Sequence, residues 1–325
     1  MAELRWHPLI NDWIMIASNR QARPTMPKDY CPFCPGSGKV PDEFEVLKYD
    51  NDFPALSQNP PVPDPVDTEF FKTRPSYGKC EVILYSPGHT VTLPELSYEH
   101  VGKLVNLWCE RFSEISSDKN IKYVFIFENR GEPVGVTMPH PHGQIYGYSV
   151  VPKKIQLEME SAKTYKEEKD KCLFCDMLEN EMKEDKRIIF KNEHFTVFLP
   201  FFSEYPYGVY IMSNKHKNYI TDFNEEERAA LAVTLRDTVG MLDSLFDYPF
   251  PYMMCMHNAP VNVEEKIDDN FHFHIEFFPP MRSKDKQKFN ASSETGVWAH
   301  CNPTCPEDTA EELRAAYKKF TKKEN

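Results

Sequence analysis

Hydrophobic residues recur along this chain with two periods, one typical of strands and one typical of helices. Residues 80–85 and 122–127 are short runs rich in β-branched and aromatic side chains, which predicts two buried strands. Between them, Ser97 precedes a stretch whose apolar positions keep helical spacing: Val101, Leu104, Val105, Trp108, Phe112 and Ile115. Serine is a common N-terminal cap, so a helix is expected to begin after Ser97.

The same succession occurs again in the second half of the chain. Residues 208–212 and 252–257 are apolar runs that are expected to be strands. Between them, Asn224 precedes a second stretch with helical spacing, formed by Leu231, Leu235, Val239, Leu242 and Phe246. Residues 4–17 are also expected to be extended, with a turn at positions 11 and 12.

Candidate chemistry is concentrated in a His-Pro-His-Gly-Gln motif, which lies between two extended runs. His140, His142 and Gln144 alternate along the backbone, so they share one face, with neighbours about 6–7 Å apart. A neutral imidazole can attack phosphorus while an amide donates to the phosphate oxygens. The second imidazole is better used as a metal ligand. A His-x-His pair alone is also common as packed or solvated side chains, so the interpretation depends on the rest of the chain.

Each half of the chain also carries a Cys-x-x-Cys pair that is expected to form a tight turn. In each half this pair is followed by a strand that leads into a histidine four residues later, then by a capped helix, a strand and a His-x-His pair. His89 precedes Ser97 by 8 residues, and His216 precedes Asn224 by 8 residues. Chance recurrence of this order is improbable, so we infer an internal duplication of about 130–150 residues per unit. The two units are expected to be residues 1–151 and 152–325.

The duplication assigns two sets of metal ligands, each with two thiolates and two imidazoles. The sets are Cys31, Cys34, His89 and His140 in the first unit, and Cys172, Cys175, His216 and His272 in the second. Such sets suit tetrahedral zinc. Because protein side chains fill all four positions, both sites are predicted to be structural.

Once one histidine of each His-x-His pair is assigned to metal, His142 and His274 remain as the imidazoles that can take part in chemistry. The residue two positions further on separates them, because Gln144 can donate to a phosphate whereas Glu276 would repel one. The first unit is therefore predicted to carry the reaction. The alternative is that His142 only supports the zinc site.

The composition and charge of the chain limit the kinds of molecule that it can bind. The chain has 325 residues and a formal net charge of −12 at pH 7, which argues against a nucleic-acid surface. An anionic substrate must then meet local cations, and Arg20 and Arg23 in a basic loop are candidates. The apolar pattern predicts neither a signal segment nor a membrane-spanning run, and the paired cysteines favour metal binding in a reducing compartment. A cytoplasmic protein without a membrane partner is expected.

The motifs resemble those of galactose-1-phosphate uridylyltransferases, a two-repeat branch of the histidine-triad superfamily. The resemblance covers nearly the whole chain and is carried by residues 9–14, 51–56, 128–131, 140–144, 278–280 and 306–308. It implies an α+β fold in which the antiparallel strands of two histidine-triad-like repeats form a half-barrel, with helices packed outside. It also implies a homodimer.

The resemblance further implies a reaction. His142 would attack the α-phosphorus of UDP-glucose, release glucose 1-phosphate and hold UMP until galactose 1-phosphate takes it, which is ping-pong chemistry through a uridylyl-histidine. The positions implied to bind substrate are Gln144 and Thr137 for the phosphates, Asn129 and Arg23 for the diphosphate with Arg20 nearby, Asn51, Asp52 and Phe53 for the uridine, and Lys288 and Glu294 for the hexose.

Two departures from the family pattern leave alternatives open. Some members fill the second metal site with one glutamate and three histidines, and the matching residues for an iron site here are Glu158, His257, His272 and His274. The cysteine set is preferred because thiolates hold zinc better than a carboxylate does. Ser293 stands where an aromatic residue accompanies the hexose-binding glutamate in familiar members, which weakens the assignment of the sugar.

Two other functions compete with this hypothesis. A plant branch of the family, which resembles this chain in both Cys-x-x-Cys pairs, acts as an ADP-glucose phosphorylase. The third candidate is a non-catalytic nucleotide-binding protein stabilised by zinc. Such a protein would form no covalent intermediate, and the pairing of His142 with Gln144 would then have no purpose.

Overall fold

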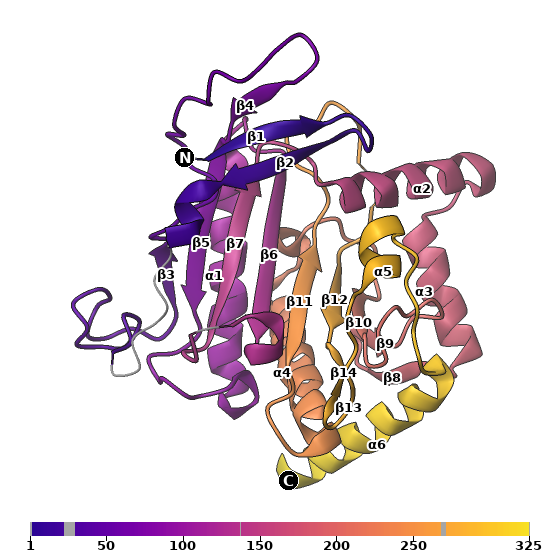
Figure 1. Cartoon of the computed structure of the whole chain (residues 1–325). Coiled ribbons are helices and arrows are strands. Elements are labelled where there is room, and N and C mark those ends of the chain that lie inside the picture. Colours follow the sequence, from indigo (N-terminus) through magenta and orange to yellow (C-terminus); the bar gives the residue numbers. More distant parts are fainter. Residues whose placement is uncertain (1, 23–29, 137, 268–270, 325) are drawn as a thin grey trace.

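The computed structural model describes residues 2–22, 30–136, 138–267 and 271–324 (Figure 1). Its main feature is a nine-stranded antiparallel sheet in the order β3-β5-β7-β6-β11-β12-β10-β9-β8. These strands are β3 (Leu47–Asp50), β5 (Gly78–Leu84), β6 (Tyr123–Arg130), β7 (His142–Tyr148), β8 (Ile188–Lys191), β9 (Phe195–Phe198), β10 (Tyr210–Ser213), β11 (Tyr252–His257) and β12 (His274–Phe278). The described sheet ends at β3 and β8, so it is open and does not close into a barrel.

The two halves of the chain meet in the middle of this sheet, where β6 pairs with β11. Outwards from this junction the order is β6, β7, β5 and β3 on one side, and β11, β12, β10 and β9 on the other, where β8 adds one further strand at the edge. The four strands predicted from apolar runs correspond to β5, β6, β10 and β11. The expected combination of helices with an antiparallel sheet is confirmed.

Two helices cover one face of the sheet across both halves. They are α1 (Tyr98–Ser117) and α4 (Glu225–Phe246), and α6 (Pro306–Glu324) packs against α4 (Figure 1). Ile145 on β7 and Ile275 on β12 are fully buried and belong to the same hydrophobic cluster as these helices. One continuous core therefore supports the whole sheet.

Both predicted helix caps are confirmed. The Ser97 hydroxyl accepts a hydrogen bond from the backbone N–H of His100 at 3.1 Å. The side chain of Asn224 accepts from the backbone N–H of Glu227 at 2.9 Å, and the Glu227 carboxylate accepts in return from the backbone N–H of Asn224 at 2.9 Å. These reciprocal bonds satisfy donors that the first turn of the helix leaves unpaired.

The opposite face of the sheet is covered differently in the two halves. In the second half, α2 (Lys153–Lys169) and α3 (Leu173–Glu184) pack on it, and Ile155 and Phe174 join one cluster with Met212 of β10. In the first half, the same face carries a row of aromatic side chains on β6 and β7. The apolar pattern did not reveal α2 because this helix buries few of its residues.

A small sheet in the order β2-β1-β4 lies beyond the end of β7 (Figure 1). It is formed by β1 (Ala2–His7), β2 (Asp12–Ala17) and β4 (Thr73–Pro75). This confirms the extended segment and the turn predicted near the N-terminus. Smaller elements are η1 (Ser18–Ala22), η2 (Leu93–Glu95), η3 (Glu132–Val134), η4 (Ile220–Asp222), β13 (Met281–Ser283), β14 (Lys286–Gln287) and α5 (Ser292–Val297).

Among the residues that the structure describes, the helices include none with the length and apolar character needed to cross a membrane.

Candidate active site and metal-binding clusters

His142 is the first residue of β7, where the strand pairs with β5. Its Nδ1 lies 2.8 Å from the carbonyl oxygen of His140. A carbonyl can only accept a hydrogen bond, so Nδ1 carries the proton and the lone pair of the neutral ring is on Nε2. The ring of Phe33 meets the His142 ring edge-on, with 5.8 Å between centroids. The imidazole is therefore held in one orientation, with Nε2 defined as its nucleophilic atom.

Gln144 lies two residues further along β7 and so shares a face of the strand with His142. The hydroxyl of Tyr146 donates to Oε1 of Gln144 at 3.0 Å. This bond orients the amide so that its N–H₂ group is the end that can donate to a phosphate oxygen.

A cavity of about 330 Å³ lies beside His142. Asn129, near the end of β6, lines the same cavity, as do Glu128 and Arg130. Arg130 forms a bidentate ion pair with Asp243, at 2.7 and 2.9 Å. The Asp243 carboxylate therefore balances the positive charge of Arg130. The structure thus brings His142 and Asn129 together at one cavity.

A buried polar group behind His142 was missed in the sequence. The hydroxyls of Tyr85 and Tyr252 each donate to the Glu128 carboxylate at 3.1 Å. Burial raises the pKa of Glu128 to about 7. The signal available in the sequence was that a glutamate directly follows the strongly apolar run of residues 122–127, most of which belongs to β6 in the structure.

A Cβ on Gly143 would lie only 2.4 Å from the Tyr85 hydroxyl, so the motif needs glycine at this position.

The residues predicted to meet uridine lie at one end of β3. Oδ1 of Asn51 accepts from the backbone N–H of Phe53 at 2.9 Å, and this bond shapes the turn that also contains Asp52. Arg20 lies in η1. Its positive charge is close enough to Cys80 on β5 to oppose the rise in the pKa of that thiol caused by burial. Arg20 and β3 therefore lie near the same part of the sheet.

The predicted hexose-binding residues are held together in the second half. Nζ of Lys288 lies 3.7 Å from the Glu294 carboxylate and 4.8 Å from the centre of the Tyr205 ring. The lining of the cavity at His142, as far as the structure describes it, includes neither Lys288 nor Glu294. The other two predicted residues, Arg23 and Thr137, lie outside the described residues.

The first predicted metal set comes together in the fold. The ligand atoms of Cys31, Cys34, His89 and His140 all lie within 4.8 Å of one another. Sγ of Cys34 is 3.3 Å from Nδ1 of His89 and 3.6 Å from Nδ1 of His140. Nε2–H of His140 donates to the carbonyl of Ser86 at 2.8 Å, which turns Nδ1 toward the thiols. Burial raises the pKa of Cys34 to about 11, and a divalent cation would bind it as the thiolate.

The second set also comes together, although its local structure differs from the prediction. The ligand atoms of Cys172, Cys175, His216 and His272 lie within 4.8 Å of one another. Sγ of Cys175 is 3.2 Å from Nδ1 of His216 and 3.3 Å from Nδ1 of His272. The expected tight turn is wrong here, because Cys172 caps α3 and Cys175 lies in its first turn. A hydrogen bond from Cys175 lowers the pKa of Cys172, against the opposing effect of burial.

A third cluster contains three of the four residues of the alternative iron set, without His272. Its ligand atoms belong to Glu158, His257, His274 and Glu276. His272 is instead placed with the cysteines. Nζ of Lys154 on α2 donates to Glu276 at 2.5 Å. Although burial raises the pKa of Glu276, the charges of His257 and Lys154 hold it well below its usual range.

Comparison with known proteins identifies relatives over nearly the whole chain. Family models of galactose-1-phosphate uridyl transferase match residues 2–152 with the N-terminal domain and residues 158–321 with the C-terminal domain. A galactose-1-phosphate uridylyltransferase from Thermotoga maritima is 40% identical over 315 residues, which cover 97% of this chain and 98% of that protein. The galactose-1-phosphate uridylyltransferase from Rattus norvegicus is 30% identical, over 96% of this chain and 86% of the relative.

Solved structures give the same result. A uridylyltransferase superposes with a TM-score of 0.90 at 31% identity, over 98% of this chain and 99% of the other. An ADP-glucose phosphorylase from Arabidopsis thaliana with bound ADP-glucose superposes with a TM-score of 0.75 at 25% identity, over 97% of this chain and 99% of the other.

The separation of the clusters predicts how metal content responds to mutation. The purified protein is expected to hold about two equivalents of zinc, and Cys175→Ser to lose about one of them together with much thermal stability, because a closed site contributes folding energy. Glu158→Ala is the control and should leave the zinc content unchanged. Loss of a metal from Glu158→Ala, with full content in Cys175→Ser, would show that the ligands are assigned wrongly.

The buried Glu128 predicts a pH-dependent stability. The pKa of Glu128 is raised from 4.5 to about 7 on folding, so the folded state keeps a proton that the unfolded state releases in this window. Stability is therefore lost as pH rises from 4.5 to 7, by at most about 3 kcal/mol. Glu128→Gln removes this loss, and its melting temperature relative to wild type should rise between pH 5 and 7. Glu132→Gln, at the exposed rim, controls for the lost carboxylate. A constant difference for Glu128→Gln would contradict the prediction.

Proposed function

The chain belongs to the galactose-1-phosphate uridylyltransferase family, and from this membership we propose that it transfers UMP from UDP-glucose to galactose 1-phosphate. The family is one of transferases that act on a nucleotide sugar and a sugar phosphate. The observation that carries the proposal is the position of His142, whose Nδ1 is bound to a carbonyl while its ring lines a cavity.

The first half-reaction uses Nε2 of His142 as the nucleophile. Nε2 attacks the α-phosphorus of UDP-glucose, an N–P bond forms, and the bond from phosphorus to the bridging oxygen breaks, so glucose 1-phosphate leaves with that oxygen. The ring becomes positively charged as it is uridylylated. The His140 carbonyl, 2.8 Å from Nδ1, stabilises this charge and keeps the ring from turning.

The second half-reaction reverses these bonds. A phosphate oxygen of galactose 1-phosphate attacks the uridylyl phosphorus, the N–P bond breaks, and UDP-galactose leaves. We assign the amide of Gln144 to the phosphate oxygens and Asn129 to the diphosphate. The other assignments proposed from the family motifs are Arg20, Arg23 and Thr137 for the phosphates, and Asn51, Asp52 and Phe53 for the uridine.

We also infer that the chain is a duplication of two histidine-triad-like units, residues 1–151 and 152–325, joined in a half-barrel. The matching strand orders on either side of β6 and β11 support this inference. Ser86 and Ser213 support it further, because each contacts Nε2 of a metal-set histidine and lies three residues before another. We propose zinc for both Cys₂His₂ sets, where it would act as a structural staple.

We further propose that the protein acts as a homodimer in the cytoplasm. Lys288 and Glu294 contact each other rather than the cavity at His142. Hexose binding by these two residues therefore requires that they reach the site of a second subunit. Phe289, Val297 and Trp298 are exposed in the same segment, and association would bury these apolar side chains.

ADP-glucose phosphorylase activity is the second candidate. The structural match with the Arabidopsis thaliana enzyme covers nearly the whole chain, although its TM-score and identity are lower than those of the uridylyltransferase. The presence of both Cys-x-x-Cys pairs favours it specifically. A binding protein without catalysis has no such support in a family of transferases.

Replacing the nucleophile tests the role of His142. His142→Asn is expected to keep the fold and both metals but to lose turnover by at least about three orders of magnitude, because it removes the nitrogen on which the N–P bond is proposed to form. The matched control is His194→Asn, since His194 lies between β8 and β9, beside Glu226 and at the opposite edge of the sheet from β3. Near-normal turnover in His142→Asn would rule out the assignment.

Isotope exchange tests both the mechanism and the nucleotide. Label should pass between glucose 1-phosphate and UDP-glucose when galactose 1-phosphate is absent, because the first half-reaction is complete in itself. Exchange that needs the second sugar would indicate direct transfer instead. The same measurement with ADP-glucose decides between the candidates, and faster exchange with ADP-glucose would favour the phosphorylase.

A further inference from the structure

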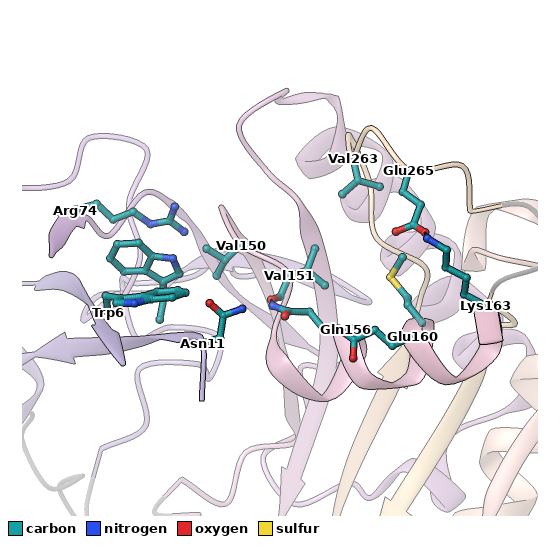
Figure 2. Close-up of a pocket in the computed structure, with 12 residues that line it drawn as sticks. Trp6, Asn11, Arg74, Val150, Val151, Gln156, Glu160, Lys163, Val263 and Glu265 are labelled. Carbon is teal, nitrogen blue, oxygen red and sulfur yellow. Dashed lines mark hydrogen bonds and ion pairs between the residues drawn. The ribbon is translucent and has the colours of Figure 1, made fainter. Parts of the chain in front are cut away.

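A second cavity, whose lining residues are drawn in Figure 2, includes Val150 and Val151. These residues follow the end of β7 that is opposite to His142. The volume of this cavity is about 440 Å³, which falls in the usual range of roughly 300–1,000 Å³ for small-molecule sites. The β1–β2 hairpin, β4 and α2 contribute to its walls, and it shares no lining residue with the cavity at His142. The strand rises about 3.3 Å per residue, so the two cavities lie roughly 20 Å apart.

Arg74 of β4 and two tryptophans form one end of this cleft. The guanidinium carbon of Arg74 lies 4.2 Å from the centre of the Trp13 ring. The Trp13 ring is 5.2 Å from that of Trp6, at an angle of 58°. Figure 2 shows the Arg74 guanidinium extending in the direction of Val150. An aromatic wall and a cation therefore meet at the same point.

Two nitrogens of the Arg74 guanidinium have no acceptor among the residues that the structure describes. Its Nε and Nη2 atoms are buried and have no hydrogen-bond partner among the described residues. These two nitrogens form one edge of the guanidinium, and their parallel N–H groups match the two oxygens of a carboxylate or phosphate. Buried donors without acceptors are unfavourable.

The charge of Arg74 is also unbalanced. Burial lowers its pKa, and no carboxylate in the described part of the chain acts against that shift. The chain has 50 acidic and 38 basic residues, so acidic partners are abundant elsewhere. A partly buried cation that still lacks one points to an anion supplied from outside.

The rest of the cleft suits an apolar, flat group. Val150, Val151, Met159 and Val263 contribute apolar side chains to its lining. At the far end, Lys163 is paired with Glu265 at 3.1 Å, so this second cation is already neutralised. Asn11 holds a backbone φ of 54°, which only a few residue types tolerate, and its amide faces the cleft between the two ends in Figure 2.

We propose that this cleft is a binding site for a small aromatic anion, meaning a flat ring that carries one carboxylate or phosphate group. The anionic group accepts the two N–H groups of Arg74 after a small rotation of the guanidinium into the cleft. The ring lies between the tryptophans and the apolar wall. The site is independent of His142 and of the reaction proposed there.

Ligand titration of the full-length protein tests the chemistry. Two of the four tryptophans line the cleft, so intrinsic fluorescence reports on binding. The probes are benzoate, phenyl phosphate, cyclohexanecarboxylate and inorganic phosphate. Benzoate or phenyl phosphate should bind about tenfold more tightly than the two probes without a flat ring, and the better of them identifies the anionic group. Equal affinity for all four probes, or no binding, would overturn the proposal.

Substitution of Arg74 tests the site. Arg74→Leu should weaken binding of the better probe by about tenfold or more, while Arg282→Leu, at an exposed position of β13, should not change it. Without ligand, Arg74→Leu should be at least as heat-stable as wild type, because it removes an unpaired charge. Isotope exchange at His142 should be retained. A lower melting temperature with unchanged binding would show that Arg74 only braces Trp13, and would overturn the proposal.

Arg74→Lys covers the case in which Arg74→Leu fails to fold. Lysine keeps the positive charge but lacks the paired N–H edge, so binding should again weaken relative to wild type. Full affinity in Arg74→Lys would contradict the proposed contact.

Discussion

The pairing of β6 with β11 is the contact on which the rest of the structure depends. It joins the two halves through residue pairs that run from Tyr252 with Arg130 to Met256 with Ile126. Ile126 and Met254 point from these two strands into the core that α1 and α4 share. Each half alone would leave a strand edge without partners and would expose its part of this core to water. The nine strands therefore provide one rigid support for both sets of histidines.

On this support, two equivalent histidines have different surroundings. His142 and His274 each donate from Nδ1 to a carbonyl oxygen two residues earlier, at 2.8 Å. His142 lines a cavity, whereas His274 is buried beside Glu276, whose charge is balanced by Lys154. An anionic substrate can approach the first histidine, while the carboxylates around the second would repel it. The first half has Gln144 where the second half has Glu276. Helix α2 adds to this difference, because it covers the second half and its Lys154 contacts Glu276.

The orientation of His142 is fixed by hydrogen bonds and packing contacts with neighbouring groups of the protein. The ring of His140 is held by the Ser86 carbonyl on one side and by the thiols on the other, and its own carbonyl orients His142. On the opposite side of the strand, Gly143 lies directly over the Tyr85 hydroxyl, which is bonded to Glu128. Burying a carboxylic acid is unfavourable. Here the buried Glu128 holds the Tyr85 hydroxyl against Gly143, and this contact keeps the backbone of the motif in place.

The sequence alone determined the features that depend on neighbours along the chain. Apolar spacing predicted α1 and α4, the residues Ser97 and Asn224 marked where they begin, and the repeated order of cysteines and histidines predicted both metal sets. Only the tertiary structure decided the contacts between distant residues. It gathered Glu158 with His257, His274 and Glu276, put Cys175 in a helix, set Lys288 apart from the cavity at His142, and brought Arg74 onto Trp13. Periodicity reports which face of an element is buried, but it carries no information about which other element covers that face.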